Sequence, residues 1–205
     1  MKYQHIVFDV DGTLVDNAYA ILRSLQQTVQ EFTGKTYPFE ELTFCLGIPG
    51  MDTLQQLDIG DKNAAFNRWV ELLNSLFHTA KLFDGIQPLL EQLRQAGFCL
   101  GIVTSRKRHV LEEDLPGFGI REYFGTTVCE EDSQKHKPNP DPLLAYMAKT
   151  GARPEQILYI GDSIYDFRCA TSAGCDFALA YWGAQRHFEG ARSCPQPMDI
   201  LELCK

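Results

Sequence analysis

The feature that most constrains the fold is a repeated alternation of short apolar runs with amphipathic stretches in the C-terminal two thirds of the sequence. Apolar runs predict strands over residues 5–10, 98–103, 126–129, 157–160 and 177–180. Helical periodicity predicts helices over residues 88–96, 107–115, 142–150 and 164–173. This alternation is typical of βαβ units, so the sequence predicts an α/β fold: a Rossmann-like parallel sheet core covered by helices on both faces.

Residues 16–81 have a different rhythm. They contain four amphipathic, helix-like segments and no convincing strand; in the first segment, apolar residues recur at helical spacing at Ala18, Ile21, Leu25 and Val29. We therefore expect a small all-helical domain, residues 16–81, inserted into an α/β domain of residues 1–15 plus 82–205. Ligands of open parallel sheets bind beyond the carboxyl ends of the strands, so the insertion is expected to overhang the ligand site.

Composition narrows the class of protein. The formal net charge of −8 over 205 residues argues against a nucleic-acid partner. No stretch approaches the ~20 apolar residues that span a bilayer, and the N-terminus lacks the pattern of a secretory signal. We expect a cytoplasmic protein with no membrane partner. The seven cysteines form no Cys-x-x-Cys pair, which favours reduced thiols and gives no support for a zinc site.

Polar residues follow four of the predicted strands. They are Asp9 and Asp11 with Gly12, then Thr104 and Ser105, then Lys137 some residues further on, and finally Asp162 and Asp166. Several have ordinary explanations: Thr104 could cap the next helix, Lys137 could be a solvated lysine, and the later acids could face a helix dipole. Asp9 is harder to explain, because a carboxylate that ends a buried strand needs a partner.

Taken together, these residues predict one site. Four neighbouring carboxylates repel one another unless a cation is present, and oxygen ligands of this kind suit Mg²⁺. The hydroxyl and amine donors among them suit the oxygens of a phosphate group. One carboxylate could attack phosphorus, and a second could transfer the proton.

The motifs carry a family resemblance. Asp9-Val10-Asp11-Gly12-Thr13-Leu14, Thr104-Ser105, Lys137-Pro138-Asn139-Pro140 and Gly161-Asp162 with Asp166 resemble, in this order, the four motifs of the haloacid dehalogenase-like hydrolase superfamily. The helical insertion resembles the small cap of its phosphoglycolate phosphatase and β-phosphoglucomutase-like branch. Residues 170–183, which include Trp182-Gly183, are also similar to the phosphoglycolate phosphatase group.

The resemblance implies a catalytic core of residues 1–15 plus 82–205, a helical cap of residues 16–81, and Mg²⁺ as the cofactor. It also implies a role for each motif residue. Asp9 is the expected nucleophile and a metal ligand; Asp11 is the expected general acid and base, with its backbone carbonyl on the metal; Gly12, Thr104 and Ser105 bind the phosphoryl group; Lys137 neutralises charge between that group and Asp9; Asp162 ligates the metal, and Asp166 supports the metal or its waters.

The expected function is therefore an Mg²⁺-dependent phosphatase that hydrolyses a small phosphorylated metabolite through an aspartyl-phosphate on Asp9. The dehalogenases of the superfamily lack the second acid, so Asp11 favours phosphoryl chemistry. A β-phosphoglucomutase-like mutase stays open, although the loop of residues 45–52 lacks the cation that would grip a sugar phosphate. An inorganic pyrophosphatase and a non-catalytic module that binds a phosphorylated ligand also stay open, as does the choice between monomer and dimer.

Overall fold

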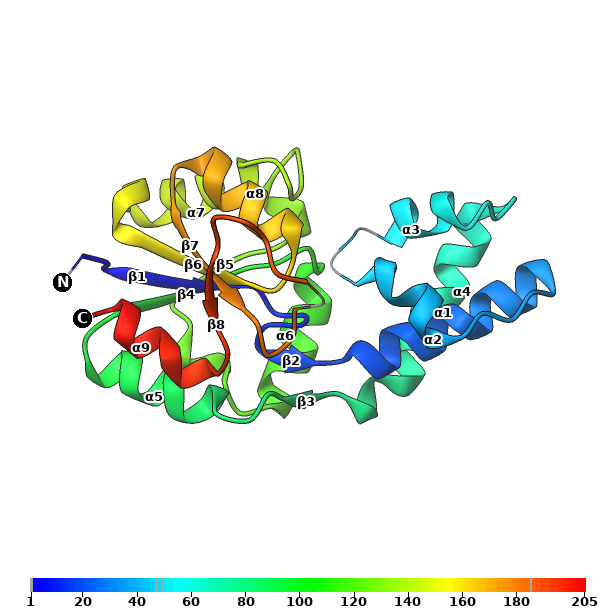
Figure 1. Ribbon diagram of the computed structural model, residues 1–205, viewed down its shortest axis with the longest axis horizontal. Coiled ribbons are helices and arrows are strands. Elements are labelled where there is room, and N and C mark those ends of the chain that lie inside the picture. Colours follow the sequence, from blue (N-terminus) through cyan, green and yellow to red (C-terminus); the bar gives the residue numbers. More distant parts are fainter. Residues whose placement is uncertain (1, 47, 49, 185) are drawn as a thin grey trace. The chain divides into compact units, whose positions relative to one another are not determined.

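The chain divides into two compact units, of which one comprises Met1–Val15 and Leu82–Lys205 and the other Asp16–Lys81 (Figure 1). The computed structural model describes residues 2–46, 48, 50–184 and 186–205. Among these residues, no helix combines the length and apolar character needed to cross a membrane.

The larger unit is built on a six-stranded sheet, and each neighbouring pair of its strands is parallel. Its spatial order is β5-β4-β1-β6-β7-β8. The bounds are β1 His5–Phe8, β4 Cys99–Val103, β5 Thr126–Val128, β6 Ile157–Gly161, β7 Asp176–Ala180 and β8 Arg192–Cys194. The strand order reverses at β1 and β6, which is the order of a doubly wound Rossmann-like fold. The predicted fold class is confirmed.

Helices cover both faces of this sheet. Helices α7 (Asp141–Thr150) and α8 (Ile164–Ala173) lie on one face, and α5 (Ile86–Gln95) and the short α9 (Ile200–Leu203) lie on the other (Figure 1). A further helix, α6 (Arg108–Gly117), connects β4 to β5. Each predicted helix of this unit is present, with bounds that differ by no more than two residues at either end.

The edge strand β8 was not predicted from the sequence. Its residues Arg192 and Ser193 are polar and only Cys194 is buried, because an edge strand has a neighbour on one side alone. Two further short strands, β2 (Val15–Asp16) and β3 (Lys81–Leu82), pair where the chain passes between the two units. Strands of two residues leave no periodicity to detect.

The described residues of the smaller unit form four α-helices: α1 (Ala18–Thr33), α2 (Phe39–Leu42), α3 (Gly50–Gln56) and α4 (Lys62–Leu76). Its core combines buried apolar residues of all four of these helices, and the Trp69 indole donates a hydrogen bond to Ser24 Oγ at 2.9 Å. The helical periodicity of this stretch predicts an apolar stripe that includes Trp69, Val70 and Leu73. The structure confirms Trp69, but the rest of the buried face carries Ala65 and Leu72. That face follows the i, i+4, i+7 spacing of one helix side.

Candidate active site

The site lies at the point where the strand order reverses. Strand β1 pairs with β6, and both end at the same edge of the sheet. Asp9 follows β1 directly, and its backbone N–H donates to the Ile160 carbonyl at 2.9 Å. Asp162 follows β6 directly. Two adjacent strands therefore deliver two carboxylates to the crevice where ligands of this fold bind.

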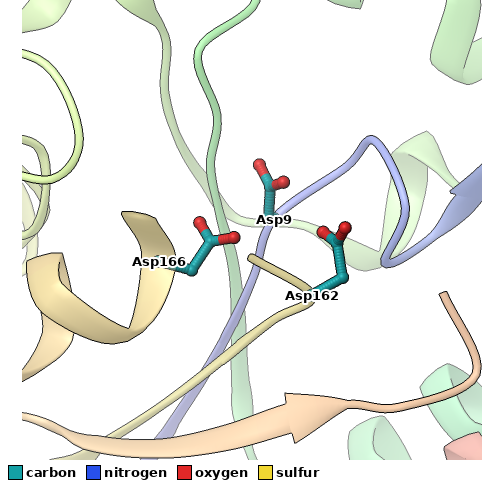
Figure 2. Close-up of side chains that lie close together, drawn as sticks. All are labelled: Asp9, Asp162 and Asp166. Atoms are coloured by element: carbon teal, nitrogen blue, oxygen red, sulfur yellow. The ribbon is translucent and has the colours of Figure 1, made fainter. Parts of the chain in front are cut away.

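A third carboxylate, Asp166 in the first turn of α8, completes a cluster. One carboxylate oxygen from each of Asp9, Asp162 and Asp166 lies within 4.8 Å of the other two. The three side chains project to the same side of the strand ends (Figure 2). All three residues are buried, with 8%, 7% and 1% of their surface exposed. So dense a group of acids away from water needs positive charge.

Lys137 supplies part of that charge. Its Nζ donates to Asp9 Oδ1 at 2.8 Å and to Asp166 Oδ1 at 2.7 Å. The lysine is buried and lies on the loop between β5 and α7, where the Lys137–Pro138 peptide bond is cis. The alternative that Lys137 is a solvated surface lysine is wrong. Its position bridges the acid that follows β1 and the acid on α8.

Asp166 accepts more hydrogen bonds than the other two acids. Its Oδ1 also accepts from the Tyr159 hydroxyl at 2.9 Å, and its Oδ2 accepts from the Ser163 hydroxyl at 2.5 Å and the Ser163 backbone N–H at 3.1 Å. Ser163 and Asp166 form a capping box that begins α8, so the reading of Asp166 as a helix-terminal acid is confirmed. Tyr159 was not predicted as a site residue, although a hydroxyl in an otherwise apolar strand is a signal.

Burial and crowding shift the ionisation of the cluster. Burial raises the pKa of Asp9 from its usual value near 3.8 to about 7; the Asp166 and Asp11 charges add to this rise, while Lys137 opposes it. Burial, with the charges of Asp166 and Asp9, also raises the pKa of Asp162 well above its usual value. Burial lowers the pKa of Lys137, but Asp166 and Asp9 outweigh it, so that pKa is raised.

These observations bear on the metal. The site offers hard oxygen atoms and sets one lysine against three acids. Burial, together with the neighbouring acids, keeps the pKa of Asp9 raised despite the lysine. A divalent cation would remove this repulsion, and Mg²⁺ prefers carboxylate oxygens and water. The donor set therefore fits Mg²⁺. Asp162 Oδ1 accepts from the Thr13 hydroxyl at 3.2 Å, which orients this carboxylate.

The loop after Asp9 passes close to Asp162. Gly12 has φ of 74°, a left-handed conformation that favours glycine. A Cβ atom at this position would lie 2.3 Å from Asp162 Oδ2. The glycine is therefore required twice, by the turn and by the approach to the carboxylate.

Asp11 lies outside the carboxylate cluster. The sequence predicts four acids in one crevice. The Asp11 side chain is instead held by Arg106, whose Nε is 2.8 Å from Oδ2 and whose Nη2 is 2.5 Å from Oδ1. The other guanidinium nitrogen, Nη1, donates to Asp114. Asp11 stays near enough to raise the pKa of Asp9. Arg106 was missed, although it directly follows the Thr104-Ser105 motif.

Thr104 and Ser105 differ in their surroundings. Thr104 is buried, and its backbone N–H extends the sheet by donating to the Val128 carbonyl at 3.0 Å, while Ser105 is exposed. The alternative that they cap the next helix is wrong, since α6 begins at Arg108 without a side-chain cap. Thr104 Oγ1 instead accepts from the Arg106 backbone N–H at 3.2 Å, so it fixes the turn that carries Arg106.

Comparison with known proteins relates this geometry to a family. The sequence profile of the family described as haloacid dehalogenase-like hydrolase matches residues 6–180. Pyrophosphatase PpaX from Oceanobacillus iheyensis is 31% identical over 89% of this chain and 85% of its own length. A candidate phosphoglycolate phosphatase from Lactobacillus plantarum superposes with a TM-score of 0.91 at 31% identity, covering 99% of this chain and 100% of its own.

A more distant structure shares the fold. The haloacid dehalogenase-like family protein SP0104 from Streptococcus pneumoniae has a TM-score of 0.89 at 20% identity, over 100% of this chain and 99% of its own. At that identity the likeness concerns architecture alone.

Proposed function

Since the chain belongs to the haloacid dehalogenase-like hydrolases, in the branch of the phosphoglycolate phosphatases and β-phosphoglucomutases, and is a hydrolase of phosphoric ester bonds, we propose that it is an Mg²⁺-dependent phosphatase for a small phosphorylated metabolite. The observation that carries the proposal is the buried group of Asp9, Asp162, Asp166 and Lys137 at the point where the strand order reverses. A structural ion pair needs two charges, whereas this group holds three acids around one amine.

In the proposed reaction, an oxygen of Asp9 attacks phosphorus and the bond to the leaving oxygen breaks. One Asp11 oxygen takes up a proton from solvent and gives it to that leaving oxygen. The same carboxylate then removes a proton from the water that hydrolyses the aspartyl-phosphate. Lys137, fixed against Asp166, balances charge on the phosphoryl oxygens and on Asp9. Gly12, Thr104 and Ser105 bind the phosphoryl group.

Asp9, Asp162 and the Asp11 backbone carbonyl are the proposed metal ligands, and Asp166 supports the metal or its waters. Bound Mg²⁺ would screen the negative charge of the acids and of the phosphoryl group. Because four donors already reach the Asp166 carboxylate, we propose that its larger contribution is to hold Lys137 in place.

The unit of residues 16–81 is proposed to act as a cap that controls access and sets the choice of substrate. Gly47 and Pro49, in the loop that the mutase alternative invokes, lie outside the described residues. The proposal includes a small-molecule partner and a cytoplasmic location.

Inorganic pyrophosphate is the second candidate substrate. The support for it is the similarity to the PpaX pyrophosphatase, at 31% identity. Pyrophosphate needs the same attack on phosphorus, with phosphate as the leaving group, so the residues keep their roles.

The test is a panel of phosphomonoesters, hexose phosphates and pyrophosphate with Mg²⁺, in which released phosphate is measured and kcat/KM is ranked. We expect one class to stand out and the Asp9→Asn variant to release no phosphate above background. Conversion of a hexose 1-phosphate to its 6-phosphate without net release would favour the mutase. Absence of turnover on the whole panel, or full activity of Asp9→Asn, would leave the non-catalytic binding module.

A further inference from the structure

Trp182 and Gly183 form a short segment that has no role in the proposed reaction. The segment follows β7 in a tight turn, in which the backbone N–H groups of Gly183 and Ala184 both donate to the Ala180 carbonyl at 3.1 Å. Tyr181 is tied to the sheet edge, because its backbone N–H donates to the Cys194 carbonyl at 3.0 Å. The turn is therefore anchored to the strand framework.

The first contact of this segment is a hydrogen bond to the loop that carries Asp11. The indole N–H of Trp182 donates to the backbone carbonyl of Thr13 at 2.9 Å, across 169 positions of sequence. The acceptor belongs to the residue whose hydroxyl donates to Asp162 Oδ1. Thr13 is thus held at its carbonyl by Trp182 and oriented by its hydroxyl toward the acid that follows β6.

The second contact is a close approach of two backbones. A Cβ atom at Gly183 would lie 1.8 Å from the Gly12 carbonyl oxygen and 2.8 Å from the Gly12 carbonyl carbon. Gly183 does not have the positive φ that Gly12 has, so contact with the loop, and not backbone conformation, requires a glycine here. The ring of Phe83 closes the remaining space, at 3.1 Å from the same Cβ position.

These contacts enclose the loop of residues 11–13. The Cα side of Gly12 faces the Asp162 carboxylate, and its carbonyl faces Gly183. A displacement of the loop toward Gly183 meets backbone, and a displacement toward Asp162 meets a proposed metal ligand. The backbone of this loop, which carries Asp11, is thus confined between the turn after β7 and the Asp162 carboxylate.

We propose that Trp182 and Gly183 are positioning residues, which fix the loop of residues 11–13 between the turn after β7 and the Asp162 carboxylate and thereby place Asp11 for proton transfer. The expected effect on kcat rests on the proposed phosphatase function, but the expected effect on the order of the loop does not. Removal of the indole N–H frees the Thr13 carbonyl, and a methyl group at residue 183 pushes the Gly12 carbonyl away.

The test combines hydrogen exchange with kinetics on the full chain. Trp182→Phe keeps an aromatic ring and removes the donor, and Gly183→Ala adds the methyl group. Amides of residues 12–15 take part in turn hydrogen bonds to Val10 and Val15, so a peptide that spans residues 10–15 reports the order of the loop. We expect its exchange to rise about fivefold or more in both variants.

Matched controls separate a local loosening of residues 10–15 from a general loss of stability. Trp69→Phe removes the other indole hydrogen bond, to Ser24 in the smaller unit, and Gly125→Ala adds a methyl group where no atom lies within 4 Å. Neither control should change exchange in residues 10–15. For Trp182→Phe we expect kcat to fall about tenfold with KM changed less than about twofold, since misplacement affects the reacting geometry more than binding.

Unchanged exchange of residues 10–15 in Trp182→Phe overturns the proposal, even if kcat falls. An equal rise in Trp69→Phe also overturns it. Faster exchange in Trp182→Phe, together with a wild-type protein that hydrolyses no phosphate compound, supports the positioning of the loop while refuting the proposed function. If Gly183→Ala does not fold, Trp182→Phe decides alone.

Discussion

Arg106 binds the Asp11 carboxylate through a forked pair of hydrogen bonds, with Nε 2.8 Å from Oδ2 and Nη2 2.5 Å from Oδ1. The arginine side chain is only 10% exposed, and its third nitrogen is bound to Asp114. A planar guanidinium fixed at both ends restricts the carboxylate in position and in rotation. Asp11 is thereby kept beside the cluster of Asp9, Asp162 and Asp166 without joining it.

The two-point contact with the Asp11 carboxylate requires an arginine at position 106. In Arg106→Lys the positive charge remains but the two-point contact with Asp11 is lost, so we expect kcat to fall about tenfold or more, part of the 10²–10⁴ that general acid–base catalysis contributes. Steady-state kinetics on the best substrate provide the measurement. Arg108→Lys is the control, because Arg108 pairs with Asp132 outside the proposed site. Equal kcat values for Arg106→Lys and wild type would contradict this role of the fork.

Lys137 is expected to stabilise the folded state as well as the reaction. Lys137→Met leaves Asp9 and Asp166 buried without their shared partner, and the loss of one member of a buried ion pair costs about 3–5 kcal/mol. Urea unfolding in EDTA measures the difference. Lys149→Met, which removes a half-exposed lysine paired with Asp132, should cost less than about 1 kcal/mol. Similar losses in the two variants would show that the buried pair contributes little.

The raised pKa values predict how pH acts on the metal-free protein. The folded-state pKa of Asp9 is about 7 against a usual value of 3.8, and that of Asp162 is also raised. The folded state therefore binds more protons than the unfolded chain in this window. Stability from these carboxyls is complete below about pH 4 and is lost as the pH rises through about 7. In EDTA, the melting temperature of wild type relative to Asp9→Asn should fall from pH 5 to pH 8.

Mg²⁺ should reverse this trend, because cation binding favours the ionised acids. The increase in melting temperature on adding Mg²⁺ is expected to be larger at pH 8 than at pH 5, and small in Asp9→Asn. A stabilisation that is equal at both pH values would indicate that the cation binds elsewhere.

Two glycines with the same backbone conformation allow the effect of a strained φ to be separated from the effect of a Cβ contact with Asp162. Gly12 and Gly34 have φ of 74° and 71°, but a Cβ atom meets Asp162 at 2.3 Å in the first case and nothing within 4 Å in the second. Both Gly12→Ala and Gly34→Ala should lose about 1 kcal/mol or more from the strained φ. Only Gly12→Ala should also lose the stabilisation by Mg²⁺ and the phosphatase activity. Normal Mg²⁺ stabilisation of Gly12→Ala would show that the Asp162 carboxylate is not a ligand.

Much of the fold follows from local sequence patterns. Buried parallel strands read as apolar runs, so five strands of the sheet could be predicted, and glycines such as Gly151 and Gly174 end helices in the left-handed conformation. The sixth strand could not, because Arg192 and Ser193 carry the polar pattern of an edge. The predicted apolar stripe of α4 included Leu73, whereas its neighbour Leu72 is the buried residue, since adjacent apolar residues allow more than one stripe.

The site also contains some features that could be predicted from the sequence and others that could not. Acids at the ends of β1 and β6 could be predicted to meet, because parallel strands finish at one edge. The pairing of Arg106 with Asp11, 95 residues apart, depends on how α6 enters from β4, and nothing local in the sequence encodes it. The contact of Trp182 with Thr13 is equally remote. Charge partners fixed by tertiary packing leave no periodic signal.

The attack of Asp9 on phosphorus can be tested by rapid acid quench of the Mg²⁺-loaded enzyme with a substrate labelled in its phosphoryl group. We predict that the label binds covalently to wild type, in the peptide that contains Asp9, and that hydroxylamine releases it as it releases an acyl phosphate. Asp9→Asn should carry no label. Turnover without any covalent label, or equal labelling of Asp9→Asn, would contradict it.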